Sequence, residues 1–375
     1  MEAGRREGQD IVAPVPEQCA IGPRYHIGMN APHPAVLEYP VAAPPAPGMA
    51  LEIASRVLWL RMPLPFALDH INLWLLREDR GFTLVDTGYG DAATRVLWDR
   101  HFETTLADAP LERIIATHYH PDHLGNAAWL SERAGCPIAM THSEFLAAHA
   151  ILDQRASFAL ADTCALFRLH GMEDEHLAAL AGRGNSYRRG VPEPPRVFER
   201  LIAGDRIVAG GTTWHVIPGH GHSPEHAALH SLEAGVLISG DMLLPKISTN
   251  VAVWPAEPDG DPLARFLRSL DAFETVPPET LVLPSHGLPF RGIPLRIAQL
   301  RAHHVARLDE LAAALAEADA PRSAADVVPV LFRRPLDLQQ RYFAMGEAIA
   351  HLHHLWRSGR AERVVTGDGA IRFTA

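Results

Sequence analysis

Cysteine is scarce in this chain, which has only Cys19, Cys136 and Cys164 among its 375 residues. The three are far apart and none forms a C-x-x-C pair, so they predict neither a disulfide framework nor a redox motif. We expect all three thiols to be inert and the protein to belong in a reducing, cytoplasmic compartment.

Long apolar runs are also missing. No stretch approaches the roughly 20 residues that a membrane-spanning helix needs, and the polar start M-E-A-G-R-R-E does not resemble a signal peptide. Positive charge is in short supply, with 34 Lys and Arg against 44 Asp and Glu, a net charge of −10. This balance argues against a broad nucleic-acid surface and against an anionic membrane as partner.

A nucleophilic serine motif is absent too. No G-x-S-x-G element stands between a strand and a helix, so acyl transfer through serine is not expected. With 47% hydrophobic and 21% charged residues, the chain instead has the composition of a globular protein large enough for more than one domain.

Three regions differ in their patterning. Residues 1–50 are rich in Pro and Ala and predict an extended arm that packs on another surface or subunit, which hints at a homodimer. Residues 51–298 alternate strand-like and helix-like segments, as a layered α/β fold does, with a helical insertion at about 143–200. Residues 299–375 predict an α-rich unit that ends in a hairpin around Gly367-Asp368-Gly369, like a winged helix.

The most informative segment is Thr117–Gly125, with the sequence T-H-Y-H-P-D-H-L-G. It follows the apolar, strand-like run Ile114-Ile115-Ala116, and imidazoles with a carboxylate suit zinc, iron or manganese. An extended backbone points His118 and His120 to the same side, since they are two residues apart. Asp122 and His123 come after Pro121 turns the chain, so they can face a second ion. We therefore expect one loop to serve two adjacent metals.

Other ligand-type residues follow predicted strands elsewhere in the chain. They are Asp86 in Asp86-Thr87-Gly88, His220, His222 and His226 in the run 220–226, Asp241 after Gly240, and His286 after Ser285. Each alone is ordinary turn chemistry. Together they place polar side chains at strand ends along one edge of an α/β sandwich.

These motifs resemble those of the metallo-β-lactamase superfamily over about residues 55–295. Thr117–Gly125 matches its H-x-H-x-D-H signature, and the segments at Asp86, Gly221–His226, Asp241 and His286 match its other four motifs in order. The resemblance implies a four-layer αββα sandwich with a dinuclear metal site, most often zinc, with iron or manganese as alternatives.

The resemblance also implies a role for each residue. His118, His120 and His222 would hold the first metal, Asp122, His123 and His286 the second, and Asp241 would bridge both. His222 is preferred to His220 because Gly221-His222-Ser223-Pro224 fits the motif around the ligand. Asp86, His220 and His226 would support the ligands by hydrogen bonding.

The chemistry implied is hydrolysis. A water shared by two divalent ions loses a proton near neutral pH, and the bridging hydroxide is a nucleophile that Asp122 can orient. One metal would polarise the scissile carbonyl and stabilise the oxyanion.

The chain looks most similar to glyoxalase II-like hydrolases with a C-terminal extension, which suggests a small-molecule thioester or ester, then a lactone, as substrate. The basic and aromatic residues that bind glutathione in glyoxalase II have no match here. Two other classes stay open: an endoribonuclease of the same fold, and a persulfide dioxygenase with one iron. Flavodiiron reductases carry Glu where this chain has His120, which disfavours that redox class.

Overall fold

A computed structural model describes residues 36–375 of the chain. Most of the predicted arm and Cys19 lie outside the described residues. Residues 36–50 contain no helix or strand, and Glu38 forms an isolated β-bridge with Arg291. None of the described helices is both long and apolar enough to cross a membrane.

The first sheet has seven strands, in the order in which they occur along the chain. They are β1 (Leu51–Ala54), β2 (Val57–Pro63), β3 (His70–Arg77), β4 (Phe82–Val85), β5 (Leu111–Ile115), β6 (Ile138–Thr141) and β7 (Glu199–Leu201). The first four pair antiparallel, whereas β4 to β7 pair parallel through helical crossovers. The carboxyl ends of β4, β5 and β6 therefore meet at one edge.

The second sheet has five strands in the order β12-β11-β10-β9-β8. Their bounds are β8 (Arg206–Ala209), β9 (Thr212–Gly219), β10 (His226–Ser231), β11 (Val236–Gly240) and β12 (Leu281–Pro284). Only β11 and β12 pair parallel, joined by a helical crossover. A third, two-stranded sheet pairs β13 (Glu362–Val365) with β14 (Ile371–Thr374).

The two large sheets pack face to face through an apolar core. Trp59 and Trp74 stack at 5.9 Å between ring centroids on the first sheet, and Trp214 belongs to the same buried cluster from the second. Their bulk excludes water from the middle of the molecule, which burial of apolar surface favours. Asn72 is buried here, and its side-chain amide donates to the carbonyl of Pro284, which ties β3 to the end of β12.

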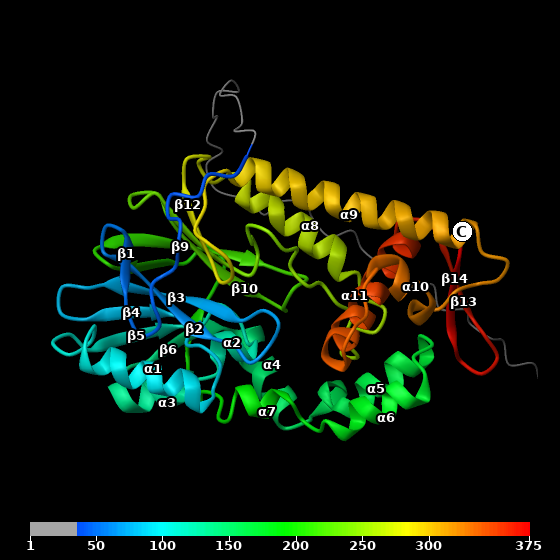
Figure 1. The fold of residues 1–375 in the computed structure, drawn as a ribbon, viewed down its shortest axis with the longest axis horizontal. Helices are drawn as coiled ribbons and strands as arrows, with labels where there is room; N and C mark the ends of the chain where they lie inside the picture. The colour runs from blue at the N-terminus through cyan, green and yellow to red at the C-terminus, as the bar shows by residue number, and fades with distance from the viewer. Residues whose placement is uncertain (1–35) are drawn as a thin grey trace, which may run out of the picture. The chain divides into compact units, whose positions relative to one another are not determined.

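Helices cover both outer faces (Figure 1). Against the first sheet lie α1 (Ala92–Glu103), α3 (Ala127–Ala134) and α4 (His142–Leu152). Against the second lie α8 (Pro262–Phe273) and α9 (Ile293–Ala316), whose apolar side chains share one cluster with that sheet. The layers are α, β, β, α, and the predicted fold class is confirmed.

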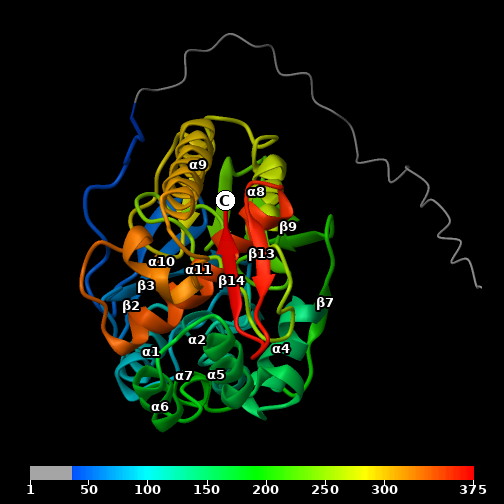
Figure 2. The same cartoon turned by 90° about the vertical axis from the view of Figure 1, so that its right-hand side faces the viewer.

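The short helix α2 (Pro121–Leu124) lies within the segment Thr117–Gly125. The remaining helices belong to the two regions that the sequence set apart. They are the 3-10 helix η1 (Ala156–Phe158), α5 (Leu160–Leu169), α6 (Asp174–Gly182), α7 (Tyr187–Gly190), α10 (Ala324–Leu331) and α11 (Leu338–Arg357). Helices α4 to α7 occupy most of residues 143–200, and that this stretch is an insertion stays a prediction. Near the C-terminus, the β13–β14 hairpin faces the viewer in Figure 2, beside α10 and α11. Helix α9 runs without a break through the predicted boundary at 298/299, and that boundary stays a prediction.

Candidate metal centre

The histidine loop begins where β5 ends, inside the molecule. Thr117 and His118 are fully buried, and Pro121 starts the short helix α2, which turns Asp122 and His123 back towards the sheet edge. Asp86 fixes the loop from the end of the neighbouring strand β4: its carboxylate accepts from the Thr117 backbone N–H at 2.8 Å and from the Thr117 hydroxyl at 3.0 Å. The backbone of Asp86 is left-handed, with φ of 61°, a conformation that Asp tolerates better than most residues.

One group of side chains gathers His118, His120, His222 and Asp241, with their ligand atoms all within 4.8 Å of one another. His118 Nε2 lies 2.9 Å from His120 Nδ1 and 3.2 Å from His222 Nε2. His222 Nε2 lies 3.3 Å from Asp241 Oδ2. Three imidazole nitrogens and one carboxylate oxygen therefore converge on one point.

A second group gathers Asp122, His123 and His286. Asp122 Oδ2 lies 3.4 Å from His286 Nε2 and 3.7 Å from His123 Nε2. The other oxygen of Asp241, Oδ1, lies 3.5 Å from each of these two imidazole nitrogens. Asp241 thus turns one carboxylate oxygen towards each group.

Three of the histidines also form a hydrogen bond through the ring nitrogen that faces away from the cluster. His123 Nδ1 donates to Asp86 at 2.8 Å, His222 Nδ1 to the Asn250 carbonyl at 2.7 Å, and His286 Nδ1 to the His70 carbonyl at 2.8 Å. Each of these bonds leaves Nε2 facing the cluster. Such contacts fix the tautomer and the orientation of ligating histidines.

Burial and neighbouring charges lower the pKa values of two histidines and one carboxyl group of the site. Burial, then the positive charge of neighbouring histidines, lowers the pKa of His118 well below its usual value and that of His120 to about 3. Burial opposes ionisation of Asp122, but His123 and His286 lower its pKa to about 2. His118 and His120 are therefore neutral, and Asp122 is ionised, near pH 7, which are the states that metal ligands need.

The predicted supporting residues differ in placement. Asp86 contacts His123 directly, and His226, fully buried, accepts from the Asp241 N–H at 3.2 Å. His220 lies outside both groups: its Nδ1 donates to the Pro224 carbonyl at 2.7 Å. Of the two candidates in the third motif, the structure thus brings His222 and not His220 to the cluster.

Glu144 is a buried residue of this region that the sequence reasoning missed. Its Oε2 accepts from the Tyr119 N–H at 2.9 Å, between His118 and His120. Its Oε1 accepts from the Ser223 hydroxyl at 2.7 Å and from the Glu225 N–H, beside His222. Burial raises the pKa of Glu144 to about 6 despite these bonds. Its place directly after β6, the strand beside β5, was the available signal.

Replacing Glu144 by Gln is expected to lower both kcat/KM and metal affinity by about 10- to 100-fold, the usual effect of losing a partner that orients ligands. The amide would turn a donor towards the Tyr119 N–H, so the two loops would shift apart. Metal titration and steady-state kinetics check this. Glu225→Gln is the matched control, because in the described part of the chain that carboxylate accepts a hydrogen bond from Ser143 alone. Equal behaviour of the two variants would contradict the role given to Glu144.

The helical insertion touches the histidine loop through α7. A Cβ added to Gly190 would lie 2.2 Å from Tyr89 and 2.5 Å from Pro121, and one added to Gly125 would lie 2.4 Å from the Gly190 carbonyl. The Tyr187 hydroxyl donates to the Tyr119 carbonyl at 2.7 Å. The insertion is therefore packed against the backbone that carries the ligands, with no room for a side chain at the closest points.

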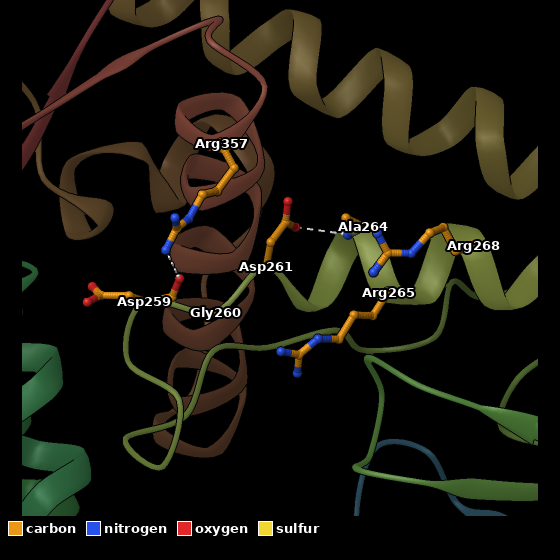
Figure 3. A pocket seen from close by; sticks show the side chains of 7 residues that line it. All are labelled: Asp259, Gly260, Asp261, Ala264, Arg265, Arg268 and Arg357. Atoms are coloured by element: carbon orange, nitrogen blue, oxygen red, sulfur yellow. Dashed lines mark hydrogen bonds between the residues drawn. The ribbon is translucent and has the colours of Figure 1, made fainter. Parts of the chain in front are cut away.

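A surface pocket lies elsewhere (Figure 3). It is lined by Asp259, Gly260, Asp261, Ala264, Arg265, Arg268 and Arg357, from the start of α8 and the end of α11. Asp261 caps α8 by accepting from the Ala264 N–H at 2.9 Å. None of the lining residues belongs to either ligand group, so we assign no part of the metal chemistry to this pocket.

The side chains present fit divalent metal ions. Within residues 36–375, His123 Nε2 and Asp241 Oδ1 are buried without a hydrogen-bond partner, which is costly unless something else satisfies them. Imidazole nitrogens at 2.9 and 3.2 Å from one another also present several donor atoms to one point, which a single cation can share. Nitrogen and carboxylate oxygen donors suit zinc, iron and manganese alike.

A family model described as the metallo-beta-lactamase superfamily matches residues 67–286, more than half of the chain. The chain belongs to this superfamily. A second model, described as the metallo-beta-lactamase-like C-terminal domain, matches residues 308–375.

Relatives support the assignment over most of the length. The chain is 47% identical to a beta-lactamase domain protein from Burkholderia ambifaria, with a TM-score of 0.83 over 90% of this chain and 98% of that one. A metallo-beta-lactamase family protein from Thermus thermophilus is 31% identical, with a TM-score of 0.72 over 86% and 99%. The probable metallo-hydrolase YqjP of Bacillus subtilis (strain 168) is 25% identical, over 83% and 94%.

Proposed function

We propose that this superfamily member is a metal-dependent hydrolase that uses two divalent ions, most simply zinc, to cleave a thioester or ester, with a lactone as the next candidate. One observation carries the proposal: Asp241 turns its two carboxylate oxygens towards two separate groups of ligand-type side chains. A shared carboxylate between two triads is what a dinuclear site requires. The name of the Bacillus relative, a probable metallo-hydrolase, agrees with a metal-dependent hydrolase.

Ions held there would lower the pKa of water at the site to near 7 and polarise a carbonyl oxygen. The side chains of the protein would orient the water and the metal ligands. Asp122 is ionised, and its side chain is 19% exposed, so it can accept a hydrogen bond from a water that approaches the cluster. The hydrogen bonds to Asp86, Asn250 and His70 keep Nε2 of His123, His222 and His286 aimed inwards.

The subtype is part of the same proposal. We place the chain with the glyoxalase II-like hydrolases, and we interpret α9 to α11 with the β13–β14 hairpin as a winged-helix-like unit. Helix α11 approaches the site: the Asn250 side chain donates to Glu347 at 3.0 Å, while the Asn250 carbonyl accepts from His222. The C-terminal unit would thus shape the acyl pocket.

The test is an activity panel on zinc-loaded protein, with acyl-CoA and glutathione thioesters, simple esters, lactones and structured RNA. We expect turnover of a thioester or ester that EDTA abolishes and added zinc restores, with about two ions per chain by elemental analysis. RNA cleavage without ester or thioester turnover would replace the proposal by an endoribonuclease. One iron per chain with oxygen consumption would replace it by a dioxygenase.

A further inference from the structure

A stretch without helix or strand connects the metal centre with the C-terminal helices. Residues 242–253, here called segment 242–253, follow Asp241 directly and precede α8. Several of its side chains are buried, among them Leu243, Val251 and Val253. Because the segment forms no regular hydrogen-bond ladder of its own, contacts with other elements must determine its conformation.

The second half of segment 242–253 contacts two of the candidate metal ligands. The Thr249 hydroxyl donates to the backbone carbonyl of Asp241. The Asn250 carbonyl accepts from His222 Nδ1 at 2.7 Å, which leaves Nε2 of that ring facing the cluster. The placement of this half therefore affects how Asp241 and His222 are oriented.

Helix α9 holds the first half through a buried arginine. Arg296 is 7% exposed, and its guanidinium donates to the Leu244 carbonyl at 2.5 Å and to the Ile247 carbonyl at 2.7 Å. A guanidinium can hold two carbonyls at once because its donors point in fixed directions. These bonds fix the segment as far as Ile247, so Asn250 depends on other contacts.

Helix α11 holds the second half. The Val253 N–H donates to the Gly346 carbonyl at 3.0 Å, and a Cβ added to Gly346 would lie 2.8 Å from a side-chain atom of the segment. The next residue of α11, Glu347, accepts from the side-chain amide of Asn250 at 3.0 Å. Asn250 thus contacts Glu347 through its side chain and His222 through its carbonyl.

The carboxyl group of Glu347 lies in a place that disfavours a charge. Burial raises its pKa to about 7, against the opposite effect of the hydrogen bond from Asn250. Its neighbours Gly346 and Ala348 are buried as well. An apolar side chain would avoid the cost of burying a carboxyl group at this position. The bond to Asn250 gives a reason for glutamate here.

We propose that Glu347 is a positioning residue of the metal centre: it holds Asn250, whose carbonyl orients His222 towards the group that also contains His118 and His120. This inference rests on the two-metal site of the proposed function. It makes α11 a working part of that site, although the helix contributes no candidate ligand.

Titration with cobalt(II) in place of zinc tests this role without a substrate, because the visible absorption of cobalt changes with the geometry of its ligands. Asn250→Ala removes the amide and keeps the carbonyl that accepts from His222. We expect Asn250→Ala and Glu347→Ala each to weaken one of the two cobalt ions about tenfold or more and to alter the spectrum. The double variant should bind no more weakly than either single variant, since both remove the same hydrogen bond.

Two further variants separate positioning from a general loosening of α11. Glu347→Gln keeps an acceptor oxygen for Asn250 and should recover most of the affinity. His354→Ala removes a different polar contact of α11, with Asp261 at the start of α8, and should keep both affinities and the spectrum. Wild-type affinities in Glu347→Ala, losses that add in the double variant, or an equal loss in His354→Ala would overturn the role of Glu347.

These titrations also keep the role of Glu347 distinct from the hydrolase proposal. A wild type that binds cobalt but hydrolyses no member of the substrate panel would end the hydrolase proposal, and the variants would still decide on Glu347. A wild type that binds no cobalt would overturn the metal centre and the role of Glu347 together.

Discussion

Replacing Asp241 by Asn is expected to lower kcat/KM by more than about 10³-fold, beyond the 10- to 100-fold that the loss of an outer partner costs. The reason is its position between the two ligand groups, with one oxygen 3.3 Å from His222 and the other 3.5 Å from His123 and His286. An amide offers one neutral oxygen, so it can serve only one group. Kinetics together with metal content per chain measure the effect.

The matched control is Asp99→Asn, since Asp99 lies on the surface and pairs with Arg133. It should keep both activity and metal content. Circular dichroism of the Asp241 variant should match that of the wild type, because the two sheets pack through residues away from the cluster. Wild-type activity with a normal metal content in Asp241→Asn would remove the shared carboxylate, and with it the dinuclear proposal.

Replacing Asp86 by Asn is expected to lower activity by about 10- to 100-fold, although Asp86 is not itself a proposed metal ligand. Asp86 is 1% exposed and accepts from the Thr117 N–H, the Thr117 hydroxyl and His123 Nδ1. Asn keeps the size and tolerates the left-handed backbone. If its oxygen still accepts from Thr117, its amide donates towards His123, which would move the imidazole proton to Nε2. A protonated Nε2 cannot bind a cation.

Metal titration distinguishes this effect from simple unfolding. Asp86→Asn should weaken one of the two ions selectively, because His123 belongs to only one group. Asp91→Asn is the control: Asp91 caps α1 by accepting from the Thr94 N–H, and Asn caps a helix equally well. Equal loss of both ions, or a loss of activity in both variants alike, would contradict the role of Asp86 in fixing His123.

Helices and strands could be predicted from the sequence where the local residue pattern agrees with the burial that the folded protein imposes. Helix α8 follows directly from its sequence, since Pro262 opens it and its buried face repeats regularly. The strands β1 and β7 have no such local pattern. Each is short, and β7 contains two exposed residues, so its strand conformation comes from pairing with β6 and not from its own apolar pattern.

The candidate metal ligands could be named from the sequence for a different reason. Ligands to one metal centre come in clusters after strands, so His118 to His123, His222, Asp241 and His286 were all named from motifs, and the structure brings these residues together. Glu144 matches no motif, because a single Glu in a helix has no local pattern, and only its place after β6 pointed to it. Its importance comes from three hydrogen bonds to segments 25 and about 80 residues away.

The glycines at the contact between α7 and the histidine loop have one more consequence. Gly90, Gly125 and Gly190 do not have the positive φ that favours glycine, yet an added Cβ at each would lie 2.2 to 2.5 Å from its nearest neighbour. Space, not conformation, requires glycine there. We therefore expect a homologue that keeps all three glycines to seat the same segment against the ligand loop, and one with larger residues there to have a different contact between α7 and that loop.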